Sequence, residues 1–159
     1  MQTLLPVAQK IGYALKRRGE TIAVAESSSG GLIAASLLSV AGASAYFVGG
    51  VVSYTRKSMS ELLKLGDDDF KQMRGLTEPT ALVMARAIRS RLSTSWGIAE
   101  IGATGPTGSR YGDAAGTSAI AIVGAKEQAM VIRTGSTDRV ANMEKFAREA
   151  LDLLYGTLA

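Results

Sequence analysis

The sequence predicts an α/β fold, a three-layer α/β/α sandwich around a mainly parallel, partly antiparallel sheet. Helix-like and strand-like segments alternate over the first two-thirds of the chain, which is typical of parallel strands covered by helices. Two strand-like segments then follow one another directly, which indicates an antiparallel portion at one side of the sheet. Because 47% of the 159 residues are hydrophobic, the chain can bury one core, and we expect a single domain over residues 1–159.

The first half of the chain contains the alternating signals. Apolar residues recur at helical spacing before Gly19, a stop signal, and predict a helix over 6–18. We then expect a buried strand, a helix, a strand and a short helix, over residues 21–25, 32–40, 51–54 and 58–65. The polar connection after them contains Asp67–Asp69, which we interpret as helix-capping and solvated residues rather than metal ligands.

The second half begins with a long helix. Thr77 can cap free backbone amides and Pro79 fits a first helical turn, so we expect this helix from Thr77 to about residue 94. Three strands follow over residues 96–105, 116–125 and 128–135, and the last two are predicted to form a hairpin. A final helix, capped within residues 136–138, is expected to run through Tyr155.

The composition excludes several kinds of catalytic site. The chain has no histidine, which rules out Ser-His-Asp catalysis and removes the commonest metal ligand. It also has no cysteine, so neither a disulfide nor a thiolate metal site can form. Hydrolytic chemistry would have to use Ser, Thr, Tyr, Lys or carboxylates, of which a serine with a lysine base is a known combination. We expect neither a metal ion nor another cofactor.

The charge pattern favours a small anionic ligand. The chain has 18 basic and 14 acidic residues, a net charge of +4, and the basic residues are scattered rather than gathered in a stripe with aromatics. We therefore do not expect nucleic acid as a partner. The amino-terminal segment lacks a signal-peptide pattern, and no apolar run has membrane-spanning length, so we expect a cytoplasmic protein without membrane contact.

Two glycine-rich turns with hydroxyl side chains follow predicted strands. The first is AESSSGG at 25–31, before a predicted helix, and the second is GATGPTGS at 102–109. Strands of an open α/β sheet end at a common edge, so the two turns are expected to line one pocket. The first turn could bind a phosphate or carboxylate, hold a nucleophile, or be a capped polar corner. Neither turn matches a phosphate loop or a dinucleotide fingerprint.

Five segments, in this order, resemble one family: AESSSGGLIAASLL, GASAYFVGGVVSYT, GLTEP, GATGPTG and GTSAIAI. Together, over about residues 7–154, they are similar to the carboxy-terminal domain of the CinA (competence/damage-inducible) family. The resemblance implies an α/β/α domain that is often oligomeric, so we expect a homo-oligomer. Enzymes of this family hydrolyse the carboxamide of nicotinamide mononucleotide and release nicotinic acid mononucleotide and ammonia.

The resemblance also implies roles for single residues. Ser27 would be the nucleophile, with Tyr54 in the catalytic group and Lys57 as the base. The residues implied to bind the anionic nucleotide are Glu26, Ser29, Gly30, Gly31, Ser44, Gly102, Thr104, Gly105 and Pro106. Glu26 either orients a neighbouring lysine or amide, which we favour, or is a buried acid satisfied by backbone amides.

The sequence departs from the family at the base. The family's lysine lies five residues after the tyrosine, where this chain has Met59, and Lys57 lies two residues earlier. Side chains two residues apart share a face only on an extended segment, so Lys57 could replace the base there but would point elsewhere in a helical turn. Two hypotheses follow: an amidohydrolase that uses Ser27, or a degenerate relative that binds a nucleotide or other anion without hydrolysis, as a sensor or subunit.

Overall fold

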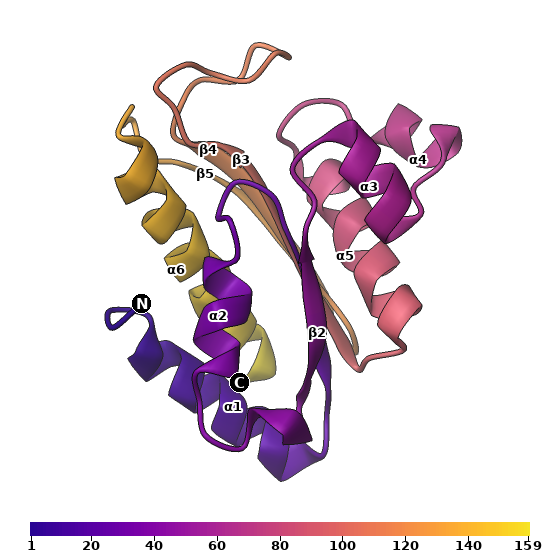
Figure 1. Cartoon of the computed structure of the whole chain (residues 1–159), viewed down its shortest axis with the longest axis vertical. Coiled ribbons are helices and arrows are strands. Elements are labelled where there is room, and N and C mark those ends of the chain that lie inside the picture. The colour runs from indigo at the N-terminus through magenta and orange to yellow at the C-terminus, as the bar shows by residue number, and fades with distance from the viewer.

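A five-stranded sheet runs through the middle of the molecule, which a computed structural model describes over residues 1–159 (Figure 1). Its strands are β1 (Ile22–Glu26), β2 (Phe47–Val52), β3 (Trp96–Ala103), β4 (Thr117–Val123) and β5 (Glu127–Arg133). Their order across the sheet is β2-β1-β3-β4-β5. β2, β1 and β3 run parallel, whereas β4 is antiparallel to both of its neighbours. The predicted fold class, including the antiparallel portion at one side, is confirmed.

Helices cover both faces of the sheet (Figure 1). One layer consists of α1 (Leu5–Arg18), α2 (Leu32–Leu38) and α6 (Arg139–Leu158). The other consists of α3 (Arg56–Leu63), α4 (Asp67–Gln72) and α5 (Glu78–Leu92). A short 3-10 helix, η1 (Ala43–Ala45), leads into β2. None of the helices combines the length and the apolar character that a membrane crossing requires.

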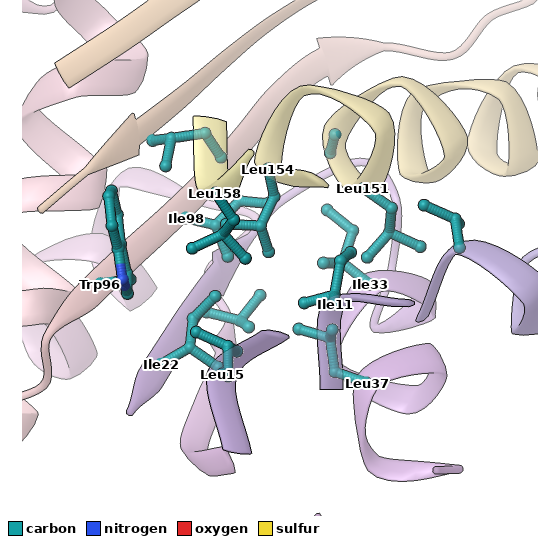
Figure 2. Packing of buried hydrophobic residues seen from close by; sticks show 14 of the residues in the cluster. Ile11, Leu15, Ile22, Ile33, Leu37, Trp96, Ile98, Leu151, Leu154 and Leu158 are labelled. Carbon is teal, nitrogen blue, oxygen red and sulfur yellow. The ribbon is translucent and has the colours of Figure 1, made fainter. Parts of the chain in front are cut away.

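The larger apolar core lies between the sheet and the layer of α1, α2 and α6 (Figure 2). Side chains alternate between the two faces of a strand, so Ile22 and Ile98 point into this core. They meet Leu15 of α1, Ile33 of α2 and Leu154 of α6. The side chain of every second residue in the central strands therefore points toward the layer of α1, α2 and α6.

The opposite face of the sheet is lined by small side chains. Ala23, Ala99 and Ala121 belong to the core under α5, together with Met84. At Gly97 the approach is closest, because a Cβ atom there would collide with the carbonyl oxygen of Ala85. α5 thus packs almost directly on the backbone of β3.

Two segments differ from the prediction. β2 begins at Phe47 rather than at residue 51, because its two glycines, which weaken the strand signal, pair with Ala23 and Val24 of β1. The segment expected as a polar connection contains α4. Its first turn consists of Asp67–Asp69, where negative charge stabilises the helix amino terminus, and Asp69 accepts a hydrogen bond from the Gly66 amide at 2.9 Å.

Candidate functional site

A cavity of about 250 Å³ lies at the carboxyl ends of β1 and β3. It is bounded by the turn after β1, the start of α3, the segment that precedes α5 and the turn after β3. The lining residues are Ser27, Tyr54, Thr55, Arg56, Met59, Phe70, Met73, Gly75, Leu76, Thr80, Ile101, Gly102, Ser109, Arg110 and Tyr111. This edge of the sheet therefore brings together parts of both glycine-rich turns and the segment after β2.

Ser27 is the first residue after β1 and lines the cavity. The residue is only 4% exposed. Its hydroxyl makes no hydrogen bond within the chain, and the hydroxyl oxygen is not fully buried. The backbone amide of Ser27, by contrast, donates to Glu100 at 3.3 Å. The hydroxyl is thus available to a molecule in the cavity.

The start of α3 decides which side chain faces Ser27. Thr55 caps this helix through the Ser58 amide, so Lys57 and Met59 both lie in helical turns. Residues two apart on a helix point in nearly opposite directions. Met59 is buried and lines the cavity, whereas Lys57 is exposed and lines a separate surface cleft. The structure does not bring Lys57 to Ser27, and no lysine lines the cavity.

Tyr54 lies at the mouth of the cavity and is 56% exposed. Its hydroxyl accepts a hydrogen bond from Arg139 at 3.4 Å. The same guanidinium donates to the carbonyl of Gly105 at 2.7 Å and so connects the segment after β2 with the turn after β3. Sequence reasoning did not select Arg139, because its two partners lie 34 and 85 residues away in the chain.

Glu26 lies below the first turn rather than in the cavity. The side chain is 1% exposed and accepts hydrogen bonds from the amides of Gly31, Ile33 and Ala34, at 2.7–3.0 Å. The free amides at the amino terminus of α2 are therefore satisfied by a side chain of the chain itself. Of the two alternatives, the structure therefore supports the one that was not favoured: Glu26 is a buried acid satisfied by backbone amides, and no lysine lies beside it.

A second buried acid, Glu100 on β3, holds the serines of the first turn. Its carboxylate accepts hydrogen bonds from five donors: the amides of Ser27 and Ser29 and the hydroxyls of Ser28, Ser29 and Ser118. Sequence reasoning missed Glu100, although a single acidic residue inside a predicted buried strand was a usable signal. The amides of the serine turn thus point inward, toward the chain's own carboxylates.

The two acids share one hydroxyl. Ser29 Oγ lies 2.6 Å from Glu26 Oε2 and 2.8 Å from Glu100 Oε2. A hydroxyl has one proton to donate, so one of these two contacts requires a proton on a carboxyl group. Burial raises the pKa of Glu26, hydrogen bonds from Ser29 and two amides oppose the rise, and the charge of Glu100 adds to it. Burial thus favours the protonated form of Glu26.

The second turn lines the cavity at Gly102 and at its last residue, Ser109, but not between them. Gly102 lines the cavity, and a Cβ atom there would lie 2.6 Å from Ser28 Oγ, so the residue also permits close packing under the serine turn. Thr104 and Gly105 are buried, and their carbonyls accept hydrogen bonds from Asn142 and Arg139. Pro106 is exposed and does not line the cavity. Thr104 and Gly105 are thus tied to α6, and neither they nor Pro106 line the cavity, which corrects their expected place in the pocket.

Ser44 lies in η1, next to the amino-terminal end of β2. The cavity lies at the other end of the parallel strands, where β1 and β3 reach their carboxyl ends. The expectation that Ser44 lines the pocket is therefore wrong. Gly30 and Gly31 have positive φ angles of 67° and 98°, which glycine adopts readily, and they turn the chain from β1 into α2. Like Ser29, they shape the loop without lining the cavity.

Two arginines that sequence reasoning did not select line the cavity. Arg56 stacks on the ring of Phe70 at 4.1 Å and lies 3.6 Å from Asp67. Arg110 makes no ion pair or hydrogen bond in the chain. Hydroxyls of Thr55, Thr80 and Ser109 complete the polar lining. The cavity thus offers cations and aromatic rings, and no group of three acidic side chains that could hold a metal ion is present.

Curated relatives share the sequence over part of their length. A CinA-like protein of Salinibacter ruber is 34% identical over 149 residues, 94% of this chain and 36% of that protein. A CinA-like protein of Acaryochloris marina is 43% identical over 98 residues, 62% of this chain and 23% of that protein. The chain therefore spans about a quarter to a third of the length of these relatives.

Solved structures have the same fold. The crystal structure of a CinA superfamily protein from Klebsiella pneumoniae superposes with a TM-score of 0.90 and 25% identity, over 98% of this chain and 97% of that one. The competence/damage inducible protein CihA from Agrobacterium tumefaciens gives 0.88 and 27%, over 96% and 94%. The CinA C-terminal domain matches residues 4–158, almost the full length. The chain therefore belongs to the CinA C-terminal domain family.

Proposed function

We propose that this domain binds an anionic nucleotide in the Ser27 cavity and does not hydrolyse it. The observation that carries the proposal is the identity of the side chain on α3 that faces the cavity, which is Met59 and not a lysine. Without a base, a serine hydroxyl stays protonated and is a weak nucleophile at neutral pH. General-base assistance typically contributes a factor of ~10²–10⁴ in rate.

The environment of Ser27 supports the same conclusion. Acyl-transfer sites stabilise the oxyanion with free amide donors. Here the amides of Ser27 and Ser29 donate to Glu100, at 3.3 and 2.8 Å, so neither is free to serve an oxyanion. A carboxylate this close also opposes the build-up of negative charge on a tetrahedral intermediate.

The lining of the cavity suits a phosphorylated ring compound. Arg110 is an unpaired cation at the cavity, and guanidinium groups bind phosphate with paired hydrogen bonds. Phe70 and Tyr111 offer aromatic faces for a base or pyridine ring. The family resemblance suggests nicotinamide mononucleotide as the first ligand to test.

Calorimetry with nicotinamide mononucleotide, combined with an assay for ammonia, tests the proposal. We expect binding without ammonia release. Arg110→Gln should weaken binding by a factor of ten or more, a loss of about 1.4 kcal/mol or above. Arg91→Gln removes an exposed arginine of α5 outside the cavity and should bind as the parent does. A parent chain that binds no nucleotide would contradict the proposal.

An amidohydrolase activity is the second candidate. It is favoured by the hydroxyl of Ser27, which lines the cavity and makes no hydrogen bond in the chain. If this candidate is correct, the parent chain releases ammonia and Ser27→Ala abolishes the release. That pair of results would replace the non-hydrolytic proposal.

A further inference from the structure

The less exposed part of the cavity lining, which we call the floor, is largely apolar. Met59 and Leu76 are 6% and 5% exposed, and three further side chains of the floor are half-buried: Phe70, Met73 and Ile101. None of these five side chains carries a nitrogen or oxygen atom. They can therefore take up the apolar surface of a ligand, but they offer it almost no hydrogen bonding.

Hydroxyl groups are the polar side chains of the floor, and most of their protons are already used within the chain. Thr80, which is 2% exposed, donates to the carbonyl of Gly75 at 2.9 Å. Ser109 donates to the carboxylate of Asp113 at 2.7 Å. Ser27, in contrast, makes no hydrogen bond through its hydroxyl. The floor thus offers a ligand one uncommitted side-chain donor.

The charged side chains of the lining lie at the mouth of the cavity. Arg56 and Arg110 are exposed there, and the rings of Tyr54 and Tyr111 are 56% and 66% exposed. Guanidinium groups bind phosphate through paired, charge-assisted hydrogen bonds. The lining therefore changes from cationic at the mouth to apolar at the floor. A ligand that matches both parts has an anionic head group and an apolar ring.

We infer that the cavity selects a monophosphate whose ring carries an apolar substituent in place of a carboxamide, and that Met59 and Ile101 determine this choice. The inference rests on the proposed function, because it assigns the ligand class of the same cavity. An apolar cavity of about 150 Å³ accommodates benzene. The present cavity, of about 250 Å³, has room for a substituted six-membered ring.

The hydrogen-bonding capacity of a carboxamide explains the selection. The group has two acceptor lone pairs and two donor hydrogens. The Ser27 hydroxyl can pair with one of them, whereas Met59 and Ile101 can pair with none. Polar groups that lose water without gaining a partner weaken binding. Nicotinamide mononucleotide would therefore bind more weakly than a monophosphate with a methyl group at the same ring position.

Calorimetry with a matched pair of probes tests the selection. The probes are meta-methylphenyl phosphate and meta-carbamoylphenyl phosphate, which share the ring and the phosphate and differ in one substituent. We expect the methyl compound to bind the parent chain about tenfold more tightly. Met59→Gln places an amide on a side chain of similar length and should reduce this ratio to about threefold or less. The matched control is Met143→Gln, the same change on α6 outside the cavity, which should keep the parent's ratio.

Ile101→Thr adds a hydroxyl at a second position of the floor and should lower the ratio as well, and circular dichroism verifies that each variant is folded. Equal binding of the two probes by the parent, or tighter binding of the carbamoyl compound, overturns the selection. A folded Met59→Gln or Ile101→Thr variant that keeps the parent's ratio overturns it too.

Nicotinamide mononucleotide is titrated in parallel to separate this inference from the proposed function. If the nucleotide binds and neither aryl phosphate does, the selection is overturned and nucleotide binding stands. If none of the three compounds binds, both are overturned. A preference for the methyl compound that the floor variants lose and the control keeps supports the selection.

Discussion

Glu26 and Glu100 set the shape of the serine turn through hydrogen bonds. Together they accept the amides and hydroxyls that the turn and the start of α2 would otherwise expose. Buried polar groups are costly unless they are paired, and no buried side-chain nitrogen or oxygen of this chain lacks a partner. The turn therefore owes its conformation to internal acids and does not require a bound anion.

The raised pKa of Glu26 predicts how stability depends on pH. Because its pKa is raised in the folded state, its favourable contribution is complete below about pH 4.5 and declines as pH rises toward the folded pKa. In the Glu26→Gln variant, the side chain at this position does not titrate. Urea unfolding at a series of pH values should therefore show the parent losing stability relative to Glu26→Gln as pH rises from 4 to 7. A difference that is constant, or that grows in the parent's favour, would contradict a raised pKa.

Met59→Lys tests whether one side chain separates binding from hydrolysis. The variant places an amine on the face of α3 that lines the cavity. We expect ammonia release from nicotinamide mononucleotide to rise by ~10²–10⁴ over the parent, the usual contribution of a general base. The double variant with Ser27→Ala should lose this gain. No gain in a folded Met59→Lys variant would indicate that Glu100 and the occupied amides also prevent hydrolysis.

Among the helices and strands, the main feature is the close packing of α5 on β3. The sheet face under α5 carries alanines, and Gly97 lets the carbonyl of Ala85 approach the strand. Interiors packed to this density do not accept an added atom without a shift of backbone. The distance between helix and sheet is thus set by side-chain size at a few strand positions.

Gly97→Ala should lower the free energy of unfolding by about 1–3 kcal/mol, because the new methyl group overlaps Ala85 and Arg89 of α5. Gly156→Ala is the control, since a Cβ atom at this exposed helical position meets nothing within 4 Å. It should stabilise the chain by about 0.5–1 kcal/mol. Urea denaturation measures both. A neutral Gly97→Ala would show that α5 can move away from the sheet without cost.

At the scale of the whole molecule, Asn142 connects three distant segments. Its side-chain amide donates to the carbonyls of Thr104 and Ser136, at 2.8 and 2.9 Å, and its oxygen accepts from Thr134. The residue is 1% exposed. One side chain of α6 thereby fixes the turn after β3 and the segment after β5.

Asn142→Ala should destabilise the chain by about 2–3 kcal/mol, because it leaves buried carbonyls without a donor. Lys145→Gln on the same helix breaks an exposed ion pair with Glu149 and should cost less than ~1 kcal/mol. Thermal or urea unfolding distinguishes the two. Equal effects would show that Asn142 contributes no more than a surface residue.

Much of the fold could be predicted from local patterns, and the misses have local causes. Helices and strands bounded by glycine, proline or capping signals were predicted at nearly the observed bounds, such as α1 before Gly19 and α5 after Thr77. β2 was predicted too short because Gly49 and Gly50 lack strand propensity and gain their conformation from pairing with β1. α4 was missed because three aspartates are common both in loops and in first helical turns.

The family, the order of the elements and the position of Ser27 after a buried strand could all be inferred from the sequence, because they depend on residues close together in the chain. That Lys57 points away from the cavity became clear from the folded chain, since it depends on α3 starting at Arg56. The fold also joins Glu26 and Glu100 through Ser29: 73 residues of chain lie between these two acids, and neighbouring strands place them side by side. Hydrogen bonds across such a separation leave no periodic trace in the sequence.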